Sequence, residues 1–239
     1  MTTIMDLLEG IEFEIPKTKD NRYEHNGVPV PRVTEILQAM WHEDSLMKWA
    51  NYLGFKRKDY IKELNYAADV GTMVHDSVEY YLNNKCFPQL PADFNVINAV
   101  NGFAQWYETV TKATSFEIIS MEQKLTCPWF GGTYDCLAKI DNKICLIDFK
   151  TSKFIGIKYY MQLAAYRYIL SLQGINIDIA MVLRLHKDEP IFSEYVVDLS
   201  VPESKAFLDN CFEGFLSLVY AYYNRQKLET QFNKLHLGV

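Results

Sequence analysis

Apolar residues recur every three or four positions in the first half of this chain, and that period predicts helices. It runs through TEILQAM, through SLMKWANYLGF with KRKDYIKEL continuing as helix behind it, and through MVHDSVEYYLNN. We expect the MVHDSVEYYLNN helix to open at Gly71-Thr72, and a fourth helix to cover about 92–113. Residues 1–30 include NGVPVPRV and are expected to be irregular or extended, because proline and glycine favour turns.

The second half of the chain begins with segments rich in β-forming residues. SFEIISMEQKLTCP, GGTYDCLAKI and KICLIDFKTS predict three strands, followed by a helix at about 158–173 that Gly174 closes. INIDIAMVLRLH and IFSEYVVDL predict two more strands, and PESKAFLDNCFEGFLSLVYAYYNRQKL a long amphipathic helix.

This order of elements predicts an α/β (α+β) fold with a central mixed β-sheet flanked by helices and an N-terminal helical region. We treat 1–239 as a single domain, with a mostly helical region at 1–70, the core at 71–200 and the C-terminal helix at 201–239.

Composition places the chain among soluble globular proteins, with 49% hydrophobic and 23% charged residues. No apolar run of about 18 residues occurs and the first residues lack a basic segment, so we expect no membrane span, no secretory signal and a cytoplasmic location. The five cysteines form no CxxC pair. Buried, reduced thiols are therefore expected rather than a zinc or iron–sulfur site.

The most informative segment is GGTYDCLAKIDNKICLIDFKTSK, which predicts a hairpin. Asp141-Asn142 is a plausible two-residue turn, because both residues tolerate positive φ. Such a turn pairs Ile140 with Lys143 and places Asp135 directly opposite Asp148, with Cβ atoms about 4.5–5.5 Å apart. A three-residue loop would separate the two aspartates.

Lys150 projects from the same sheet face as Asp148, because side chains alternate along a strand. The remaining hairpin positions are apolar on both faces, which is typical of central strands covered on both sides: Leu137 and Leu146 on the aspartate face, and Cys136, Ala138, Cys145 and Ile147 on the other. Opposed aspartates in such a place would repel each other unless a divalent cation lies between them. The alternative is a pair of solvated strand ends that Lys150 neutralises.

Four motifs occur together in one order along the chain. They are Gly71-Thr72-Met73-Val74-His75, Gly132-Thr133-Tyr134-Asp135, Asp148-Phe149-Lys150 and Gln162-Leu163-Ala164-Ala165-Tyr166. In this order and on these predicted elements, the chain resembles the RecB-like exonuclease branch of the PD-(D/E)XK nuclease superfamily, which includes phage and mitochondrial genome-maintenance exonucleases. The resemblance covers 71–166 closely, and it implies a restriction-endonuclease-like core.

The resemblance also implies the roles of the motif residues. Mg²⁺ or Mn²⁺ would be bound by His75, Asp135, Asp148 and the main-chain carbonyl of Phe149. The remaining catalytic positions are Lys150, Gln162 and Tyr166, of which Lys150 would position or activate the attacking water and stabilise developing phosphate charge. Read without the motifs, His75 could be a surface residue, Gln162 could be solvated and Tyr166 could belong to the core.

Two further acidic residues are candidates for a supporting role at the same site. Glu79 lies one helical turn after His75 and could orient its imidazole, and Glu122 lies in the strand before Asp135. Surface positions would explain both equally well.

By resemblance, the substrate would be DNA, in recombination, repair or replication in a bacterial or phage-infected cytoplasm, with a possible recombination or replication protein as partner. The net charge of −6 and pI of about 5.4 argue against wide wrapping of duplex DNA. A basic and aromatic cluster favours single strands or DNA ends instead, and its charged members are Lys48, Lys56, Arg57, Lys58 and Lys62. A solvated helix face would also explain it. The alternatives are a non-catalytic nucleic-acid-binding protein on the same fold and a structure- or sequence-specific endonuclease.

Overall fold

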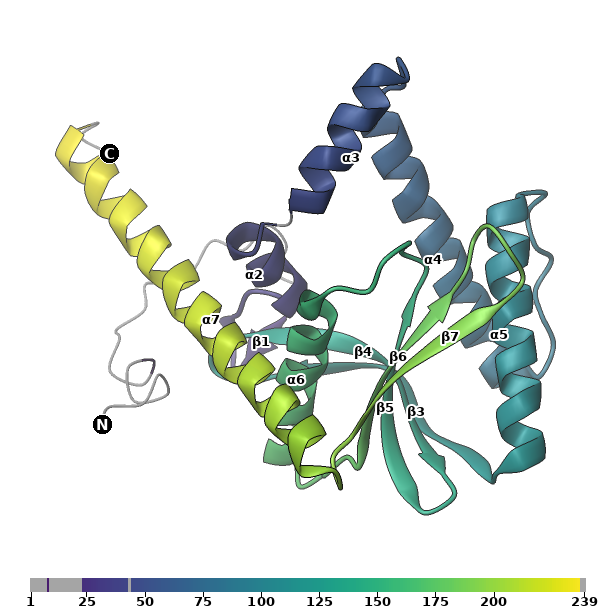
Figure 1. The fold of residues 1–239 in the computed structure, drawn as a ribbon. Coiled ribbons are helices and arrows are strands. Elements are labelled where there is room, and N and C mark those ends of the chain that lie inside the picture. Colours follow the sequence, from purple (N-terminus) through teal and green to yellow (C-terminus); the bar gives the residue numbers. More distant parts are fainter. Residues whose placement is uncertain (1–7, 9–22, 43, 237–239) are drawn as a thin grey trace.

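The computed structural model describes residues 8, 23–42 and 44–236, and a five-stranded mixed sheet forms its centre (Figure 1). The strand order is β3-β4-β5-β6-β7, with β5 and β6 parallel and the other neighbours antiparallel. The strands are β3 (Phe116–Thr126), β4 (Gly131–Ile140), β5 (Lys143–Lys150), β6 (Ile179–Leu185) and β7 (Phe192–Asp198). The predicted α/β class with a central mixed sheet is confirmed.

Helices cover both faces of this sheet. They are α2 (Val33–Met40), α3 (Asp44–Phe55), α4 (Tyr60–Asn84), α5 (Phe94–Ala113), α6 (Ile157–Leu172) and α7 (Pro202–His236). One core packs α4 and α5 against one face, and a second core packs α2, α6 and α7 against the other (Figure 1). The central strands are therefore buried on both sides, as their apolar composition predicted.

The hairpin of β4 and β5 has the predicted register. Ile140 pairs with Lys143 and Cys136 with Ile147, so the next position in register places Asp135 opposite Asp148. Asp141 adopts the positive φ of 52° that the turn needs, and its carboxylate accepts a hydrogen bond from the Ser115 backbone N–H. The two faces of the hairpin also divide as expected, with Leu137 and Leu146 in one core and Cys136, Ala138, Cys145 and Ile147 in the other.

Two details of the helical region differ from the sequence prediction. The KRKDYIKEL segment is not continuous helix, because α3 ends at Phe55 and Arg57 takes a positive φ of 52°. Asp59 then starts α4, since its carboxylate accepts hydrogen bonds from two backbone N–H groups. Gly71 does not open a helix but lies within α4, where burial of Val70 and Val74 outweighs the helix penalty of about 1 kcal/mol for glycine.

Only part of the N-terminal segment 1–30 lies among the described residues. A two-stranded hairpin joins β1 (Glu24–His25) to β2 (Val28–Pro29) through Asn26-Gly27, whose φ angles are both positive. This is the turn that Asn-Gly favours in short hairpins. Residues 1–7 and 9–22 lie outside the described residues.

The crossover from β5 through α6 to β6 determines where the site can form. Parallel neighbours need such a connection, and it returns the chain across one face of the sheet. The segment from Thr151 to Gly156 therefore joins the carboxyl end of β5, at Lys150, directly to the amino end of α6. Among the described residues, no helix is both long and apolar enough to cross a membrane.

Candidate active site

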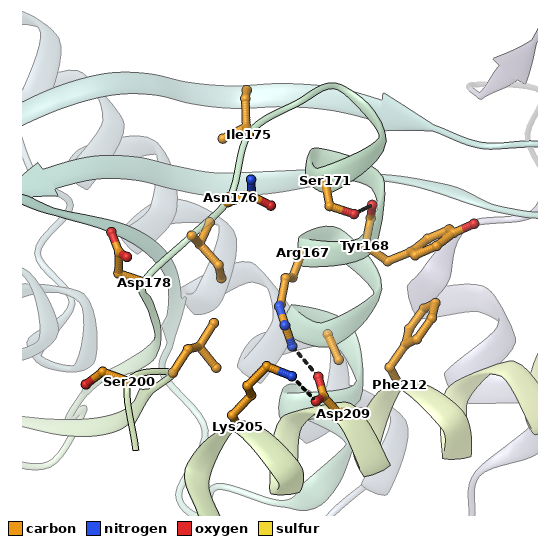
Figure 2. A pocket seen from close by; sticks show the side chains of 13 residues that line it. Arg167, Tyr168, Ser171, Ile175, Asn176, Asp178, Ser200, Lys205, Asp209 and Phe212 are labelled. Atoms are coloured by element: carbon orange, nitrogen blue, oxygen red, sulfur yellow. Dashed lines mark hydrogen bonds and ion pairs between the residues drawn. The ribbon is translucent and has the colours of Figure 1, made fainter. Parts of the chain in front are cut away.

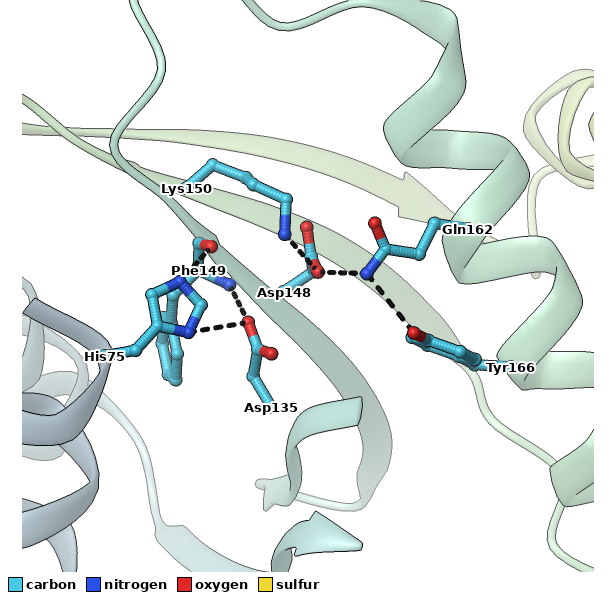
Figure 3. A network of polar contacts seen from close by, with 7 residues as sticks. All are labelled: His75, Asp135, Asp148, Phe149, Lys150, Gln162 and Tyr166. Atoms are coloured by element: carbon cyan, nitrogen blue, oxygen red, sulfur yellow. Dashed lines mark hydrogen bonds and ion pairs between the residues drawn. The ribbon is translucent and has the colours of Figure 1, made fainter. Parts of the chain in front are cut away.

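Three parts of the fold meet where β5 ends, and each brings one of the sequence motifs. α4 contributes His75, β4 and β5 contribute Asp135 and the Asp148–Lys150 stretch, and α6 contributes Gln162 and Tyr166 (Figure 3). The structure thus brings all four motifs together in one polar network, although up to 91 positions separate them in the sequence.

His75 is fixed between β4 and β5. Its Nε2 lies 2.8 Å from the carbonyl oxygen of Phe149, and its Nδ1 lies 3.6 Å from Oδ2 of Asp135. The Phe149 backbone N–H also donates to Asp135 Oδ2, at 2.7 Å. These contacts aim the imidazole, a carboxylate and a main-chain carbonyl at one small region (Figure 3).

Asp148 is the most deeply buried acidic group of the site, with 1% of its surface exposed. Lys150 Nζ donates to its Oδ1 at 2.6 Å, and Gln162 Nε2 donates to the same oxygen at 3.1 Å. The other oxygen, Oδ2, is buried and has no hydrogen-bond partner among the described residues. Burial raises the pKa of this carboxyl and Lys150 opposes the rise. A buried carboxylate oxygen without a partner needs an explanation, and a bound cation would supply one.

Lys150 carries its proton in this environment. Burial lowers its pKa, but the carboxylates of Asp148 and Asp135 outweigh that effect and raise the pKa overall. Lys150 Nζ also lies 5.4 Å from the centre of the Tyr159 ring. The side chain therefore acts as a fixed ammonium charge rather than as a base that accepts a proton.

Glu122 joins the site more directly than its sequence position indicated. One ligand atom from each of His75, Glu122 and Asp135 lies within 4.8 Å of the others. Met121 pairs with Cys136 and Gln123 with Tyr134, so the register places Glu122 opposite Asp135, and Glu122 has a positive φ of 47°. The residue is exposed, yet desolvation of its carboxyl, reinforced by the charge of Asp135, raises its pKa to about 7.

The chemistry of this donor set fits a hard divalent cation. It offers carboxylates from Asp135, Asp148 and Glu122 and the Phe149 carbonyl, which are oxygen ligands typical of Mg²⁺ and Mn²⁺, together with one imidazole. Glu79 contributes differently from what was expected: the two ring nitrogens of His75 contact Phe149 and Asp135, while the charge of Glu79 acts on Glu122.

Tyr166 supports the network from α6. Gln162 is 7% exposed and Tyr166 is 3% exposed, so both are buried rather than solvated. Gln162 Nε2 lies 3.5 Å from the Tyr166 hydroxyl while it donates to Asp148. The Tyr166 ring approaches β4 at Gly132, where a Cβ would lie 2.4 Å from Cε1 of the ring. Gly132 is thus required for the position of Tyr166.

Gly132→Ala is expected to lower stability by about 1–3 kcal/mol and to reduce activity, because the added methyl group displaces a buried ring that contacts Gln162. Gly71→Ala is the matched control. A Cβ at Gly71 would meet only Thr151 Oγ1 at 3.6 Å, an ordinary contact within α4. The Gly71→Ala substitution should raise stability by about 0.5–1 kcal/mol. Thermal unfolding of both variants checks this, and equal effects would contradict it.

The cysteines take no part in this site. Cys127, Cys136, Cys145 and Cys211 are buried, and burial raises the pKa of each thiol, for Cys136 to about 12. All five are free, as expected, but Cys86 is exposed rather than buried.

A cavity of about 420 Å³ lies elsewhere, between α6 and α7 (Figure 2). It opens beside the residues that precede β6, whereas Lys150 pairs with Arg184 near the other end of that strand. Arg167 and Lys205 both point into it, but each already forms an ion pair with Asp209 at 2.6 Å (Figure 2). None of the candidate catalytic or metal-binding residues lines this cavity, so the candidate site is the polar network at the end of β5.

Comparison with known proteins gives structural likeness only. No protein-family profile matches the chain, and no curated protein sequence matches it. A phage-related exonuclease from Haemophilus somnus 129PT is 12% identical, with 65% of this chain and 82% of that chain covered and a TM-score of 0.34. An alkaline exonuclease from Laribacter hongkongensis is 11% identical, with 66% and 83% covered and a TM-score of 0.30. The protein SSO0001 is 17% identical, with 61% and 73% covered and a TM-score of 0.27. At these identities and TM-scores, what this chain does has to be inferred from its own residues.

Proposed function

We propose that this protein is a divalent-cation-dependent nuclease of the PD-(D/E)XK superfamily that hydrolyses phosphodiester bonds in DNA. The observation that carries the proposal is the state of Asp148. Its carboxylate is buried, both of its donors bind Oδ1, and Oδ2 has no partner among the described residues. The next residue, Phe149, contacts both His75 and Asp135 of the acidic cluster. An ion pair with Lys150 alone does not explain why this buried oxygen stays unpaired in an acidic site.

The residues divide into those that would hold a cation and those that would hold the substrate phosphate. Asp135, Asp148, Glu122, His75 and the carbonyl of Phe149 form the first group. When bound there, Mg²⁺ or Mn²⁺ supplies positive charge that lowers the pKa of the attacking water and polarises a phosphoryl oxygen.

The protein's own groups do the positioning. Lys150 places an ammonium beside Asp148, where negative charge develops on the phosphate. Gln162 and Lys150 together fix the orientation of the Asp148 carboxylate, because both donate to Oδ1 (Figure 3). Tyr166 keeps its proton because burial raises its pKa well above the usual value, so it acts as a neutral support for Gln162.

The test of this function is cleavage of labelled DNA by the purified full chain. Single-stranded and duplex DNA with labels at either the 5′ or the 3′ end would be incubated with Mg²⁺, with Mn²⁺ or with EDTA. We expect cleavage with either cation and none in EDTA, and the pattern of labelled products gives the polarity. Circular single-stranded DNA separates attack on ends from internal cleavage. A folded protein that binds DNA but cleaves none of these substrates would instead be a non-catalytic binding protein.

We further propose that the enzyme is an exonuclease that prefers single-stranded DNA or DNA ends. The basic cluster supports this, because the structure exposes Lys48, Lys56, Arg57 and Lys58 on α3 and on the turn before α4. Tyr52 and Phe55 beside them are 56% and 82% exposed, and Lys56 Nζ lies 5.7 Å from the Tyr52 ring. Exposed aromatic and basic side chains together suit unpaired bases and their backbone.

Charge reversal of Lys48 and Lys56 to glutamate should weaken binding of single-stranded DNA and reduce its salt dependence. Lys58 is left unchanged because it already pairs with Glu63 at 2.9 Å. The matched control is Lys139→Glu with Lys227→Glu, an equal charge change at exposed positions on β4 and α7. Fluorescence anisotropy over a series of salt concentrations measures both. Equal losses in the two double variants would show that net charge, not this cluster, governs binding.

A further inference from the structure

The segment that links β5 to α6 is strongly basic within an acidic protein. Between Asp148 and Asp178 the chain has no acidic residue, while it has the basic residues Lys150, Lys153, Lys158 and Arg167. The whole chain carries a net charge of −6. Positive charge is therefore concentrated immediately after the strand that bears the site.

An exposed aromatic ring stands in the middle of this segment. Phe154 is 74% exposed, and Lys153 Nζ lies 5.8 Å from the centre of its ring. Ile157, at the start of α6, is 49% exposed. Large apolar side chains exposed beside lysines are typical of surfaces that stack unpaired bases.

The exposure of Phe154 does not come from a loosely held segment. After it, Ile155 and Tyr159 pack against the core of α2, α6 and α7; before it, the carbonyl of Ser152 accepts a hydrogen bond from Arg184 Nε at 3.0 Å. The neighbours are anchored while the ring between them faces outward.

Tyr159 connects this surface to the site. Lys158 Nζ lies 5.5 Å from the centre of the Tyr159 ring, and Lys150 Nζ lies 5.4 Å from the same centre. The Tyr159 ring thus separates the Lys158 ammonium from the Lys150 ammonium that we place at the scissile phosphate. A neighbouring phosphate of the same strand can lie close to Lys158.

The opposite side of the site has the opposite charge. There α4 carries Asp76 and Glu79, the residue next to His75 and the residue one helical turn after it. A polyanion is repelled from that side and attracted to the side of α6. The charge distribution across the site therefore selects one approach for the strand.

We propose that Lys153, Phe154 and Lys158 form the surface that holds the unpaired nucleotides next to the scissile phosphate, with a base stacked on Phe154 and backbone phosphates beside the two lysines. This inference rests on the proposed nuclease function and names the part of the surface that guides the strand into it. It is separate from the basic cluster of α3.

The test measures binding in EDTA, where the proposed cleavage cannot occur. Full-length protein is titrated into a single-stranded thymidine oligonucleotide and into one that contains 2-aminopurine, whose fluorescence falls when its base stacks. Phe154→Ala should weaken binding about tenfold and abolish the quenching, whereas Phe154→Tyr should retain both. Phe94→Ala is the control, because Phe94 is 82% exposed at the start of α5, outside this surface.

The lysines are tested by neutralisation. Lys153→Gln with Lys158→Gln should lower the slope of log affinity against log salt by about 1.4, the value for two phosphate contacts on a single strand. Lys139→Gln with Lys227→Gln should leave the slope unchanged.

The outcomes separate this inference from the proposed function. Wild-type binding and quenching that persist in Phe154→Ala would overturn the inference even if the enzyme cleaves DNA with Mg²⁺. Loss of binding and quenching in Phe154→Ala, from a wild-type protein that cleaves nothing, would uphold the surface and reject the nuclease.

Discussion

Replacement of Asp148 by asparagine is expected to lower kcat/KM for DNA cleavage by about a thousandfold or more while the protein remains folded. The substitution keeps the volume of the side chain and removes its charge, so the orphaned Oδ2 is no longer a carboxylate oxygen that a cation can use. A loss of this size corresponds to about 4 kcal/mol of transition-state stabilisation.

The fold should tolerate the change. Asp148 is 1% exposed and burial raises its pKa, so its charge is costly in the protein without a cation. Lys150 loses a partner, but its side chain is 17% exposed and the attraction of Asp135 remains. We expect the melting temperature to change by less than about 4 °C, the shift that 1 kcal/mol causes in a chain of this size.

Cleavage rates and melting curves of the same preparations give the answer. Activity close to wild type would remove Asp148 from the site. If Asp148→Asn loses both activity and its melting transition, Asp148→Glu is tested instead, because it keeps the charge. An Asp148→Glu protein that folds but gains no activity from added Mg²⁺ or Mn²⁺ would count against the cation site.

Lys150→Met is expected to reduce turnover by about 10²- to 10³-fold, because it removes the fixed positive charge while the ligand set stays in place. Unlike Asp148→Asn, it should also destabilise the protein without cation, by about 2 kcal/mol. The deeply buried carboxylate of Asp148 then loses its charged partner, and methionine cannot replace it.

The two variants can be distinguished by added cation. Mn²⁺ should raise the melting temperature of Lys150→Met, because binding compensates the unpaired carboxylates, and should have little effect on Asp148→Asn. Lys150→Arg serves as the control for charge, since it keeps the positive charge of the side chain but changes its shape. Full turnover by Lys150→Met would show that Lys150 only neutralises Asp148, as a structural ion pair would.

Much of this site could be predicted because its chemistry lies on regular elements. Once Asp141-Asn142 is read as a two-residue turn, alternation along the strands fixes where Asp135, Asp148 and Lys150 point. Gln162 and Tyr166 follow from helical spacing, which places both on one side of α6.

What the sequence did not predict depends on irregular backbone. Glu122 could be named as a candidate, but its place opposite Asp135 depends on the register of β3 against β4, which shifts between Ile118 and Ser120 and which no turn signal indicates. The break between α3 and α4 follows from capping by Asp59, a local signal that the charged segment around it obscured. Asn26-Gly27 was a readable signal for the N-terminal hairpin, and it was taken only as a turn.

The irregular part of β3 has a second effect, on association between molecules. β3 is an outer strand of 11 residues, long enough to offer its free backbone groups to a strand of another chain. The register shift between Ile118 and Ser120 and the left-handed conformation of Glu122 interrupt that row, and Glu117 and Lys124 add charge along it. The irregular backbone of the strand that carries Glu122 therefore also makes this edge a poor template for aggregation.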